Sequence, residues 1–284
     1  MDNFEIIDKS YYGICYYDKI KNIFKLKITH NAGFFSCCSK ILDEIINHFN
    51  KYNKLPDILD TSLQFELYKP SFYNKDLDIS SDYFKENDSM TILYNKNINF
   101  SCQQYQFTNY KLLNFDSVNS FIKKYFEPSV IIRSEIKNIE DKYNLDYDNI
   151  CVLFYRGNDK ETETNLPNYK DYINIAKEIQ HKDKNIIFLI QSDESEFIKT
   201  MKEEFCNNII FEDEIRHISN NKNLSVDMIN KDTNLNFSKK FLAITYIMSK
   251  CKYVICNSGN CSLWICLYRN NFNNVHIYCN TNWV

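Results

Sequence analysis

The chain has 284 residues, of which only 4 are Gly and 4 are Pro, and its formal net charge is −3. At average usage a chain of this length has roughly 20 Gly. The spacing of the four glycines excludes both a G-x-G-x-x-G sequence and a P-loop. The slightly negative charge argues against a nucleic-acid-binding protein that depends on a positive field over its whole surface.

The rest of the composition is typical of a folded protein with one large core or two smaller ones, since 44% of the residues are hydrophobic. Heavy use of Lys, Asn, Ile and Tyr indicates an A- and T-rich genome, as in some large DNA viruses and parasites. The chain starts MDNFEIIDKS, without the features of a secretory signal, and no apolar stretch is long enough for a membrane span. We therefore expect the eleven Cys to be reduced and buried, and a cytoplasmic location, in the host cytoplasm if the source is viral.

The first part of the chain opens as a β-α-β unit. Alternating residues over 23–30 predict a strand. Ser36 is a candidate N-cap for a helix over 37–52, and a short strand follows at 57–62. Gly33 then lies in the turn between the first strand and the helix.

The middle of the chain is less regular. Residues 63–110 are rich in Tyr, Phe and Asn, and we expect irregular structure there with one strand at 91–94. Helices are predicted over 115–126 and 129–143, with a hinge near the second of them. These elements divide the chain into an amino-terminal domain (1–127), a hinge (128–149) and a carboxy-terminal domain (150–284).

The carboxy-terminal part alternates short apolar runs with amphipathic segments. This order predicts a Rossmann-like parallel sheet covered by helices, and hence an α/β fold. The predicted strands span 151–155, 185–191, 208–211, 253–257 and 275–279, and the predicted helices span 169–181, 194–205, 237–249 and 259–269.

A polar loop follows the strand at 151–155, and ligands bind beyond the carboxyl ends of strands in such sheets. Arg156 can clamp phosphate oxygens with two hydrogen bonds, and Gly157 lets the backbone turn sharply. The alternative is a solvated charged loop without function. The candidates are Arg156, Gly157, Asp159 and Lys160 for ligand binding, and Glu161 or Glu163 as general base.

Two further strand-to-helix turns are candidate ligand sites. After the strand at 253–257, backbone N–H groups at a helix start can bind a diphosphate together with Ser hydroxyls. The turn at 30–35 allows close approach of a ligand held between the domains. Ordinary helix capping by Ser258 or Asn260, or by Ser192-Asp193 after another strand, is the alternative. The candidates are Asn31, Gly33, Ser192, Asp193, Ser258, Gly259, Asn260, Cys261 and Ser262.

Other catalytic patterns give no signal. The sequence contains no G-x-S-x-G and no H-E-x-x-H. Asp76 and Asp78 form one Asp-x-Asp pair, and Asp146 and Asp148 another, but neither follows a buried strand. We interpret both pairs as surface carboxylates and predict no metal site. His217 beside Arg216 is interpreted as a lone surface histidine.

The carboxy-terminal part resembles the GDP-fucose-dependent fucosyltransferases of the α1,6- and protein O-fucosyltransferase group, over roughly residues 150–270. Residues 154–160 (FYRGNDK) are similar to the family's H-x-R motif after a strand. Gln191-Ser192-Asp193 resembles its strand ending in Thr/Ser-Asp, and residues 243–262 resemble its helix, strand and Ser-rich turn. The turn at 30–35 is similar in position to a glycine-containing turn that faces the family's cleft. The chain also resembles a glycosyltransferase-like group encoded by large DNA viruses.

This resemblance implies a GT-B fold, with two Rossmann-like domains facing a cleft, and an inverting, metal-independent transferase. The donor would be a nucleotide sugar and the acceptor a hydroxyl of a glycan or glycoprotein. Arg156 and the stretch 258–262 would bind the donor diphosphate, and Glu163 lies close to the family's acidic base. GDP-fucose is the first candidate donor. Because Phe154 replaces the motif's His and Ile244 replaces the acid that meets guanine, a UDP- or dTDP-sugar is the second.

Two other classes stay open at this point. One is a non-catalytic nucleotide- or carbohydrate-binding module that keeps the fold, and the other is a purely structural protein. The glycine positions give a test of the site itself. We expect Gly33, Gly157 and Gly259 to converge on one cleft.

Overall fold

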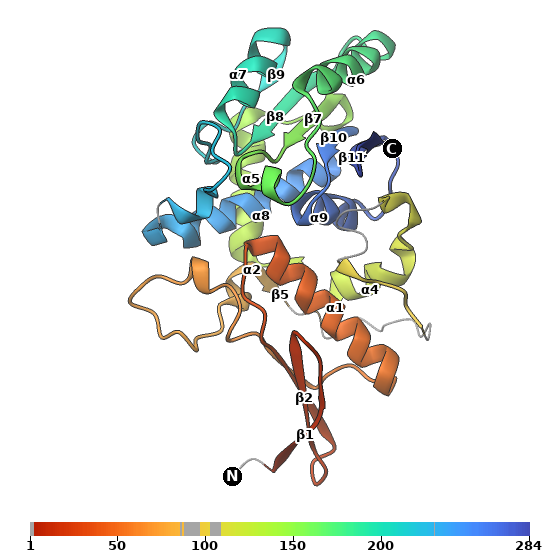
Figure 1. Ribbon diagram of the computed structural model, residues 1–284, viewed down its shortest axis with the longest axis vertical. Coiled ribbons are helices and arrows are strands. Elements are labelled where there is room, and N and C mark those ends of the chain that lie inside the picture. Colours follow the sequence, from red (N-terminus) through yellow and green to blue (C-terminus); the bar gives the residue numbers. More distant parts are fainter. Residues whose placement is uncertain (1–2, 86, 88–96, 103–108, 230) are drawn as a thin grey trace.

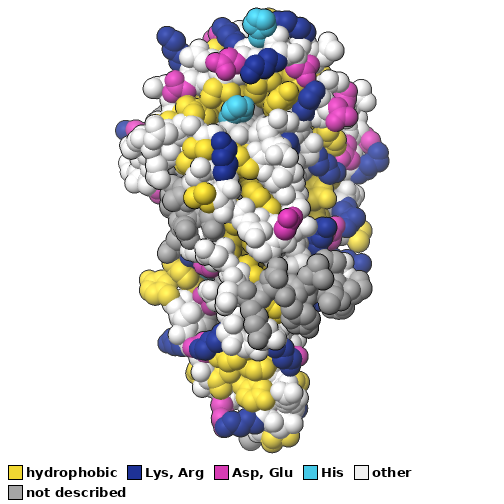
Figure 2. Space-filling model, turned by 90° about the vertical axis from the view of Figure 1, so that its right-hand side faces the viewer, with side chains coloured by type: hydrophobic (Ala, Val, Ile, Leu, Met, Phe, Trp, Pro, Cys, Tyr) yellow, Lys and Arg dark blue, Asp and Glu magenta, His cyan; other side chains and the backbone are white. Residues whose placement is uncertain are grey.

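The computed structural model describes residues 3–85, 87, 97–102, 109–229 and 231–284. The strand predicted at 91–94 lies outside these residues. The molecule is elongated, with a six-stranded sheet at one end and an antiparallel β-hairpin at the other (Figure 1). Hydrophobic side chains gather on the narrow amino-terminal end in the face drawn in Figure 2, and acidic and basic side chains are interspersed over the wider end.

The carboxy-terminal part forms the predicted parallel sheet, in the order β12-β11-β10-β7-β8-β9. All neighbours in it are parallel except the short terminal β12, which pairs antiparallel with β11. Every residue of β7 is buried, because helices cover both faces of this central strand. The strands are β7 (Ile150–Tyr155), β8 (Ile187–Ser192), β9 (Asn208–Ile209), β10 (Tyr253–Asn257), β11 (Val275–Cys279) and β12 (Asn282–Trp283).

Two sets of helices cover this sheet. One face carries α6 and α7, and the other carries α5, α8 and α9, so that the core on the second face continues toward the amino-terminal part (Figure 1). All five were predicted, with boundaries within three residues. They are α5 (Val130–Tyr143), α6 (Tyr169–Lys182), α7 (Ser195–Glu204), α8 (Asn234–Lys250) and α9 (Asn260–Arg269).

The amino-terminal sheet has the order β1-β2-β3-β4. Strands β3 (Ile23–Ile28) and β4 (Ile58–Asp60) are parallel and joined through α1 (Phe34–Tyr52), which confirms the predicted β-α-β unit. Strands β1 (Phe4–Lys9) and β2 (Gly13–Asp18) add to it antiparallel. The α/β fold class is confirmed, and in this half the Rossmann-like arrangement is limited to the β3-α1-β4 unit.

Helix α1 begins three residues earlier than predicted, and its N-cap is Gly33 rather than Ser36. The backbone N–H of Phe34 donates to the hydroxyl of Tyr68 (2.8 Å), which replaces a side-chain cap from within the helix. The hydroxyl of Ser36 instead contacts Nε2 of His30 (3.0 Å). A distant tyrosine therefore sets the start of this helix, and the local sequence does not reveal it.

Short elements connect the two halves. The predicted helix at 115–126 is confirmed as α4 (Phe115–Tyr125), and the hydroxyl of Ser129, which was predicted as the first helical residue, caps α5. Among the described residues, the other elements are η1 (Glu66–Tyr68), α2 (Ser80–Tyr83), β5 (Phe84–Lys85), η2 (Tyr110–Leu112), β6 (Glu127–Pro128), η3 (Tyr147–Asn149), η4 (Asn158–Thr162), η5 (Val226–Met228) and η6 (Lys231–Thr233).

The two halves share one hydrophobic core. Trp264 of α9 is fully buried and its indole N–H donates to the hydroxyl of Ser39 on α1 (2.9 Å). The hydroxyls of Tyr83 and Ser238 also meet across this contact (2.8 Å). The domain boundaries 1–127, 128–149 and 150–284 stay a prediction, because side-chain packing is continuous across them.

Ten of the eleven Cys are buried, which agrees with the expected burial, and Cys206 is exposed. Their burial fits the use of Cys as a small hydrophobic residue. Among the helices in the described ranges, none is both long and apolar enough to cross a membrane.

Candidate functional site

A cavity of about 370 Å³ lies between the two halves. Its walls are the start of α1, the loop after β7, the turn η5 and the start of α9, so residues from both halves contribute. The sequence-predicted candidates that line it are Gly33, Arg156, Asp159, Lys160, Glu163, Gly259, Asn260, Cys261 and Ser262.

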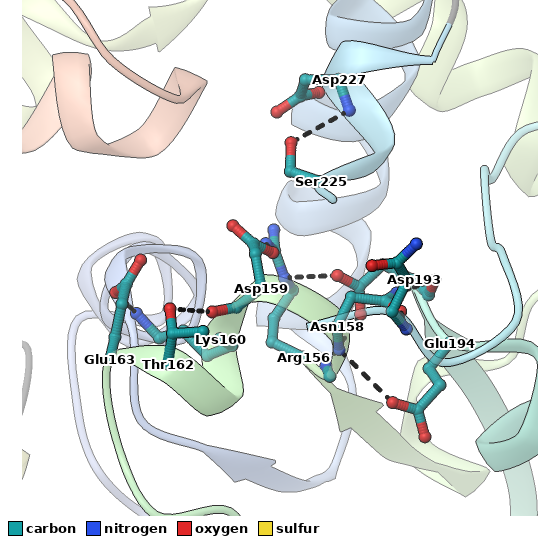
Figure 3. A network of polar contacts seen from close by, with 12 residues as sticks. Arg156, Asn158, Asp159, Lys160, Thr162, Glu163, Asp193, Glu194, Ser225 and Asp227 are labelled. Atoms are coloured by element: carbon teal, nitrogen blue, oxygen red, sulfur yellow. Dashed lines mark hydrogen bonds and ion pairs between the residues drawn. The ribbon is translucent and has the colours of Figure 1, made fainter. Parts of the chain in front are cut away.

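Arg156 is held at the mouth of the parallel sheet by its backbone. Its N–H donates to Oδ1 of Asn257 and its carbonyl accepts from Nδ2 of the same residue, both at 2.9 Å. Because Asn257 ends β10, this pair of bonds ties the ends of two neighbouring strands. The guanidinium group forms ion pairs with Asp193 (Nε to Oδ2, 3.0 Å) and Asp159 (Nη2 to Oδ1, 3.3 Å) (Figure 3).

Asp193 does not cap a helix, which was the alternative to its role as a ligand-binding candidate. Helix α7 begins later, with Glu194 as its N-cap and no side-chain cap. The carboxylate of Asp193 instead accepts from the backbone N–H of Gly157 (2.9 Å) and pairs with Arg156. The nearby Ser192 hydroxyl accepts from the N–H of Glu194 (3.0 Å). Asp193 therefore orients Arg156 and its loop, because this carboxylate has a cation and a backbone donor beside it.

The charged groups around Arg156 shift one another's pKa values. Burial alone would lower the pKa of Arg156, but the carboxylates of Asp193 and Asp159 raise it above its ordinary value. The guanidinium group thus keeps its charge. Burial raises the pKa of Asp159 above its ordinary value, while Arg156 acts in the opposite direction. One permanent cation therefore faces the cavity together with a carboxyl group that is easier to protonate than a free aspartate.

The start of α9 faces the same cavity. Gly259 is its N-cap and has a φ of 157°, which L side chains rarely adopt. The hydroxyl of Tyr110 donates to the carbonyl of Gly259 (2.9 Å) and accepts from its N–H (3.1 Å), which fixes this turn from the amino-terminal half. Neither Ser258 nor Asn260 caps the helix through its side chain. The backbone groups of the first turn, rather than a capping side chain, meet the cavity.

The predicted hydroxyl contacts of Ser258 and Ser262 need correction. Both residues are buried, and Ser258 is not among those lining the cavity. The hydroxyl of Ser262 already donates to the carbonyl of Asn257 (2.6 Å), which closes the turn between β10 and α9. Its proton is therefore used inside the protein, and anion binding at this place depends on backbone N–H groups.

The start of α1 lies opposite, and residues 32–36 line the cavity. Two helix N-termini, those of α1 and α9, thus meet one space, and both carry partial positive charge. Asn31 was predicted to bind ligand, but it does not line the cavity. Its amide donates to Oε2 of Glu66 (2.6 Å) and its Oδ1 accepts from the N–H of Glu66 (3.3 Å).

The two candidate bases differ in position. Glu163 lines the cavity, where Oε2 pairs with Nζ of Lys160 at 2.5 Å (Figure 3). Glu161 does not line it and pairs with Lys222 (2.7 Å). Of the two, only Glu163 therefore has a position beside the space that a ligand would occupy.

Asp227 and Tyr68 line or support the site but were not predicted. Asp227 on η5 lines the cavity, and its Oδ2 accepts from the hydroxyl of Tyr68 (3.0 Å). Burial raises the pKa of Asp227, while Arg156 acts to lower it. Tyr68 in turn accepts from the first N–H of α1, so one hydroxyl links both halves. Both residues lie in irregular stretches without a motif, and they therefore could not be predicted from the sequence.

Two of the three glycines that were expected to converge on one cleft do so. Gly33 and Gly259 line the cavity, but Gly157 is not among the lining residues. A Cβ at Gly157 would lie 2.1 Å from Oε2 of the buried Glu194, so Gly157 permits close packing beneath the loop. Gly13 is remote from the site and lies against Glu44.

The remaining candidates lie around this cavity or away from it. Ser192, Asp193 and Arg216 line a smaller pocket next to it. His217 is exposed and its Nδ1 contacts the hydroxyl of Ser195 (2.8 Å), as expected of a surface histidine. Within the described part of the chain, no group of three or more His, Cys, Asp or Glu residues is placed to hold a metal ion.

Comparison with known proteins gives matches among solved structures alone. The chain matches no model of a protein family, and a search of curated proteins finds no match. It is similar to the NodZ α1,6-fucosyltransferase soaked with GDP-fucose (9% identity, TM-score 0.38, 60% of this chain and 51% of that chain). Similar values hold for the fucosyltransferase NodZ from Bradyrhizobium (10%, 0.37, 61% and 51%) and for a mutant of Arabidopsis thaliana FUT1 in complex with GDP (11%, 0.35, 59% and 36%). The chain therefore spans about half the length of the NodZ structures.

Proposed function

We propose that the protein is a glycosyltransferase of GT-B type that uses a nucleotide-sugar donor. The observation that carries this proposal is the meeting of two helix N-termini, Arg156 and Lys160 at one cavity between the halves. Helix N-termini and Arg both bind phosphate oxygens well, and together they match a diphosphate group. The motif resemblance of the carboxy-terminal part supports a sugar nucleotide as the source of that diphosphate.

The proposed reaction is an inverting displacement. Glu163 removes the proton from an acceptor hydroxyl of a glycan or glycoprotein, and the oxygen attacks the anomeric carbon of the donor. The bond from that carbon to the diphosphate breaks, and the nucleoside diphosphate leaves with the electron pair. Arg156 and the first turn of α9 stabilise the charge on the leaving group, which makes the reaction independent of a metal ion. The carboxylates of Asp159 and Asp227 also face this space.

We propose both a chemical class for the donor and a first candidate within that class. A nucleoside diphosphate sugar follows from the site, and fucose carried by GDP is the first candidate from the motif resemblance. A UDP- or dTDP-sugar is the second, because Phe154 and Ile244 lack the hydrogen-bonding groups that the fucosyltransferase motifs have at these positions. The cytoplasmic location and the viral source also stay predictions.

Replacing Arg156 tests the function. We expect Arg156→Ala to lose on the order of 2–4 kcal/mol of transition-state stabilisation, which lowers kcat/KM for donor turnover by about 30- to 1000-fold. Because the buried carboxylate of Asp193 would lose its cation, this variant is compared with the double variant Arg156→Gln/Asp193→Asn, which removes both charges together. Donor turnover close to that of the unchanged protein in either folded variant would contradict the proposed role.

A non-catalytic binding protein is the second candidate function. The specific observation in its favour is the 2.5 Å ion pair between Glu163 and Lys160, which holds the candidate base against a cation. The pair occupies Oε2 of Glu163, one of the two oxygens with which this carboxylate could accept a proton from a substrate. Donor hydrolysis in the absence of acceptor distinguishes the two candidates, since a binding protein leaves the donor intact.

A further inference from the structure

A small pocket of about 30 Å³ adjoins the diphosphate cavity. It lies between the inner side of α8 and the ends of β7 and β8, and it shares Arg156, Asp227 and Phe241 with the larger cavity. The side chains of Phe237, Ile244 and Met248 on α8 make most of its wall apolar. Apolar walls with a few polar groups are typical of pockets that bind flat organic rings.

Gln191 is the unusual polar group in this pocket. It is the fifth residue of β8 and only 2% exposed. Neither Nε2 nor Oε1 of its amide has a hydrogen-bond partner within the described residues. A buried amide without partners costs free energy of folding, so its presence needs an explanation. A ligand that offers one donor beside one acceptor would satisfy both amide atoms at once.

The position of the amide fits one end of the proposed donor. A diphosphate beside Arg156 and the start of α9 leaves its nucleoside free to extend past Arg156, and the small pocket opens from that same residue. Phe237 and Phe241 stack on one another (centroids 5.7 Å apart, planes at 8°), and the guanidinium group of Arg216 lies over the Phe237 ring (4.3 Å). A ring that replaces Arg216 there would meet aromatic surface. The carboxyl ends of parallel strands are also the usual place for the base of a nucleotide.

We propose that this pocket is the base subsite of the donor and that the amide of Gln191 recognises the hydrogen-bonding edge of the base. This inference rests on the proposed function. Nucleobases present adjacent donors and acceptors, as in N3–H and O4 of uracil or N1–H and O6 of guanine, and a Gln amide can pair with both members. The pocket is smaller than a base, so entry requires movement of the irregular segment 212–229, which contributes Ile215, Arg216, Val226 and Asp227 to its wall.

Isothermal titration calorimetry of the full chain with inorganic pyrophosphate, GDP, UDP, dTDP and ADP tests the proposal. The unchanged protein should bind pyrophosphate and should prefer one nucleoside diphosphate over the others. Gln191→Met keeps the length of the side chain but removes both hydrogen-bonding atoms. We expect this variant to bind the preferred nucleotide about 10- to 100-fold more weakly than the unchanged protein does, and to bind pyrophosphate with an affinity within about twofold of that of the unchanged protein.

Two further variants make the result specific. Gln191→Glu replaces the amide donor by an acceptor and should change the order of preference among the bases. Gln180→Met makes the same chemical change as Gln191→Met on α6, outside the pocket, and should preserve both the order and the affinities. The base subsite would be overturned if Gln191→Met kept both the order of preference among the nucleotides and the affinity for the preferred one. It would also be overturned if this variant lost affinity for pyrophosphate and for the nucleotides equally. Either result would leave the proposed diphosphate site standing. Failure of the unchanged protein to bind pyrophosphate or any nucleotide would overturn the proposed function as well.

Discussion

Gly157 and Gly33 both precede helical turns beside the cavity, but their surroundings differ. A Cβ at Gly157 would meet Oε2 of Glu194 at 2.1 Å and the ring of Tyr155 at 2.9 Å, whereas a Cβ at Gly33 would have no heavy atom within 4 Å among the described residues. Gly33 also has an ordinary φ of −59°. Glycine is therefore required for steric reasons at position 157, and it is not required at position 33.

We predict that Gly157→Ala lowers the free energy of unfolding by about 1–3 kcal/mol, because Glu194 must leave its contacts with Asn158 and Asn220. Gly33→Ala should change it by less than about 0.5 kcal/mol. Urea unfolding of both variants measures the difference. Equal stability of the two variants would show that the packing beneath the loop is looser than described.

At this scale the sequence predicted residues whose role depends on their place after a strand. Arg156, Asp159 and Gly259 were chosen in this way, and all three line the cavity, since the carboxyl ends of β7 and β10 lie side by side. Asp227 and Tyr68 were not found, because they reach the site from irregular segments. Asp193 does not act as a helix cap, the alternative considered for it, because capping is a local rule and the cation that this carboxylate contacts is 37 positions earlier in the chain.

At the scale of elements, the start of α9 is fixed from the other half of the molecule. Tyr110 on η2 bonds both backbone groups of Gly259, and all three atoms are buried. Removal of the hydroxyl would leave a buried N–H and a buried C=O without this partner. The orientation of the first turn, and with it the proposed diphosphate site, should depend on this tyrosine.

We predict that Tyr110→Phe lowers the free energy of unfolding by about 1–3 kcal/mol and weakens pyrophosphate binding. Tyr83→Phe is the matched control, since Tyr83 is also buried between the halves but contacts Ser238, whose hydroxyl keeps its bond to the carbonyl of Leu235. The control should lose less stability and keep its pyrophosphate affinity. A similar loss of binding in both variants would indicate a general loosening of the contact rather than a local effect on α9.

The elements of the parallel sheet were predictable because each is a continuous apolar run flanked by amphipathic helices. The start of α1 was not, because the hydroxyl of Tyr68 replaces the local cap. The antiparallel pairing of β1 and β2 could not be predicted from the sequence either, since apolar and polar residues alternate too weakly in these strands to define a register. Local sequence patterns therefore predict the helices and strands of the carboxy-terminal half in more detail than those of the amino-terminal half.

At the scale of the whole molecule, the ligand cavity and the contact between the halves are parts of one structure. Trp264 and the core around it join the halves on one side, while α1, α9 and η5 leave the cavity open beside them. A ligand in this cavity touches both halves at once. Binding should therefore stabilise the whole fold against unfolding rather than one half of it.

The thermal unfolding of the protein with increasing pyrophosphate, GDP, UDP and dTDP tests the central claim most directly. A nucleoside diphosphate at 100 times its Kd should raise the free energy of unfolding by about 2.7 kcal/mol, with one cooperative transition, and Arg156→Gln/Asp193→Asn should abolish most of this increase. A transition temperature that none of these ligands changes, or one that rises equally in the double variant, would contradict a diphosphate site at Arg156.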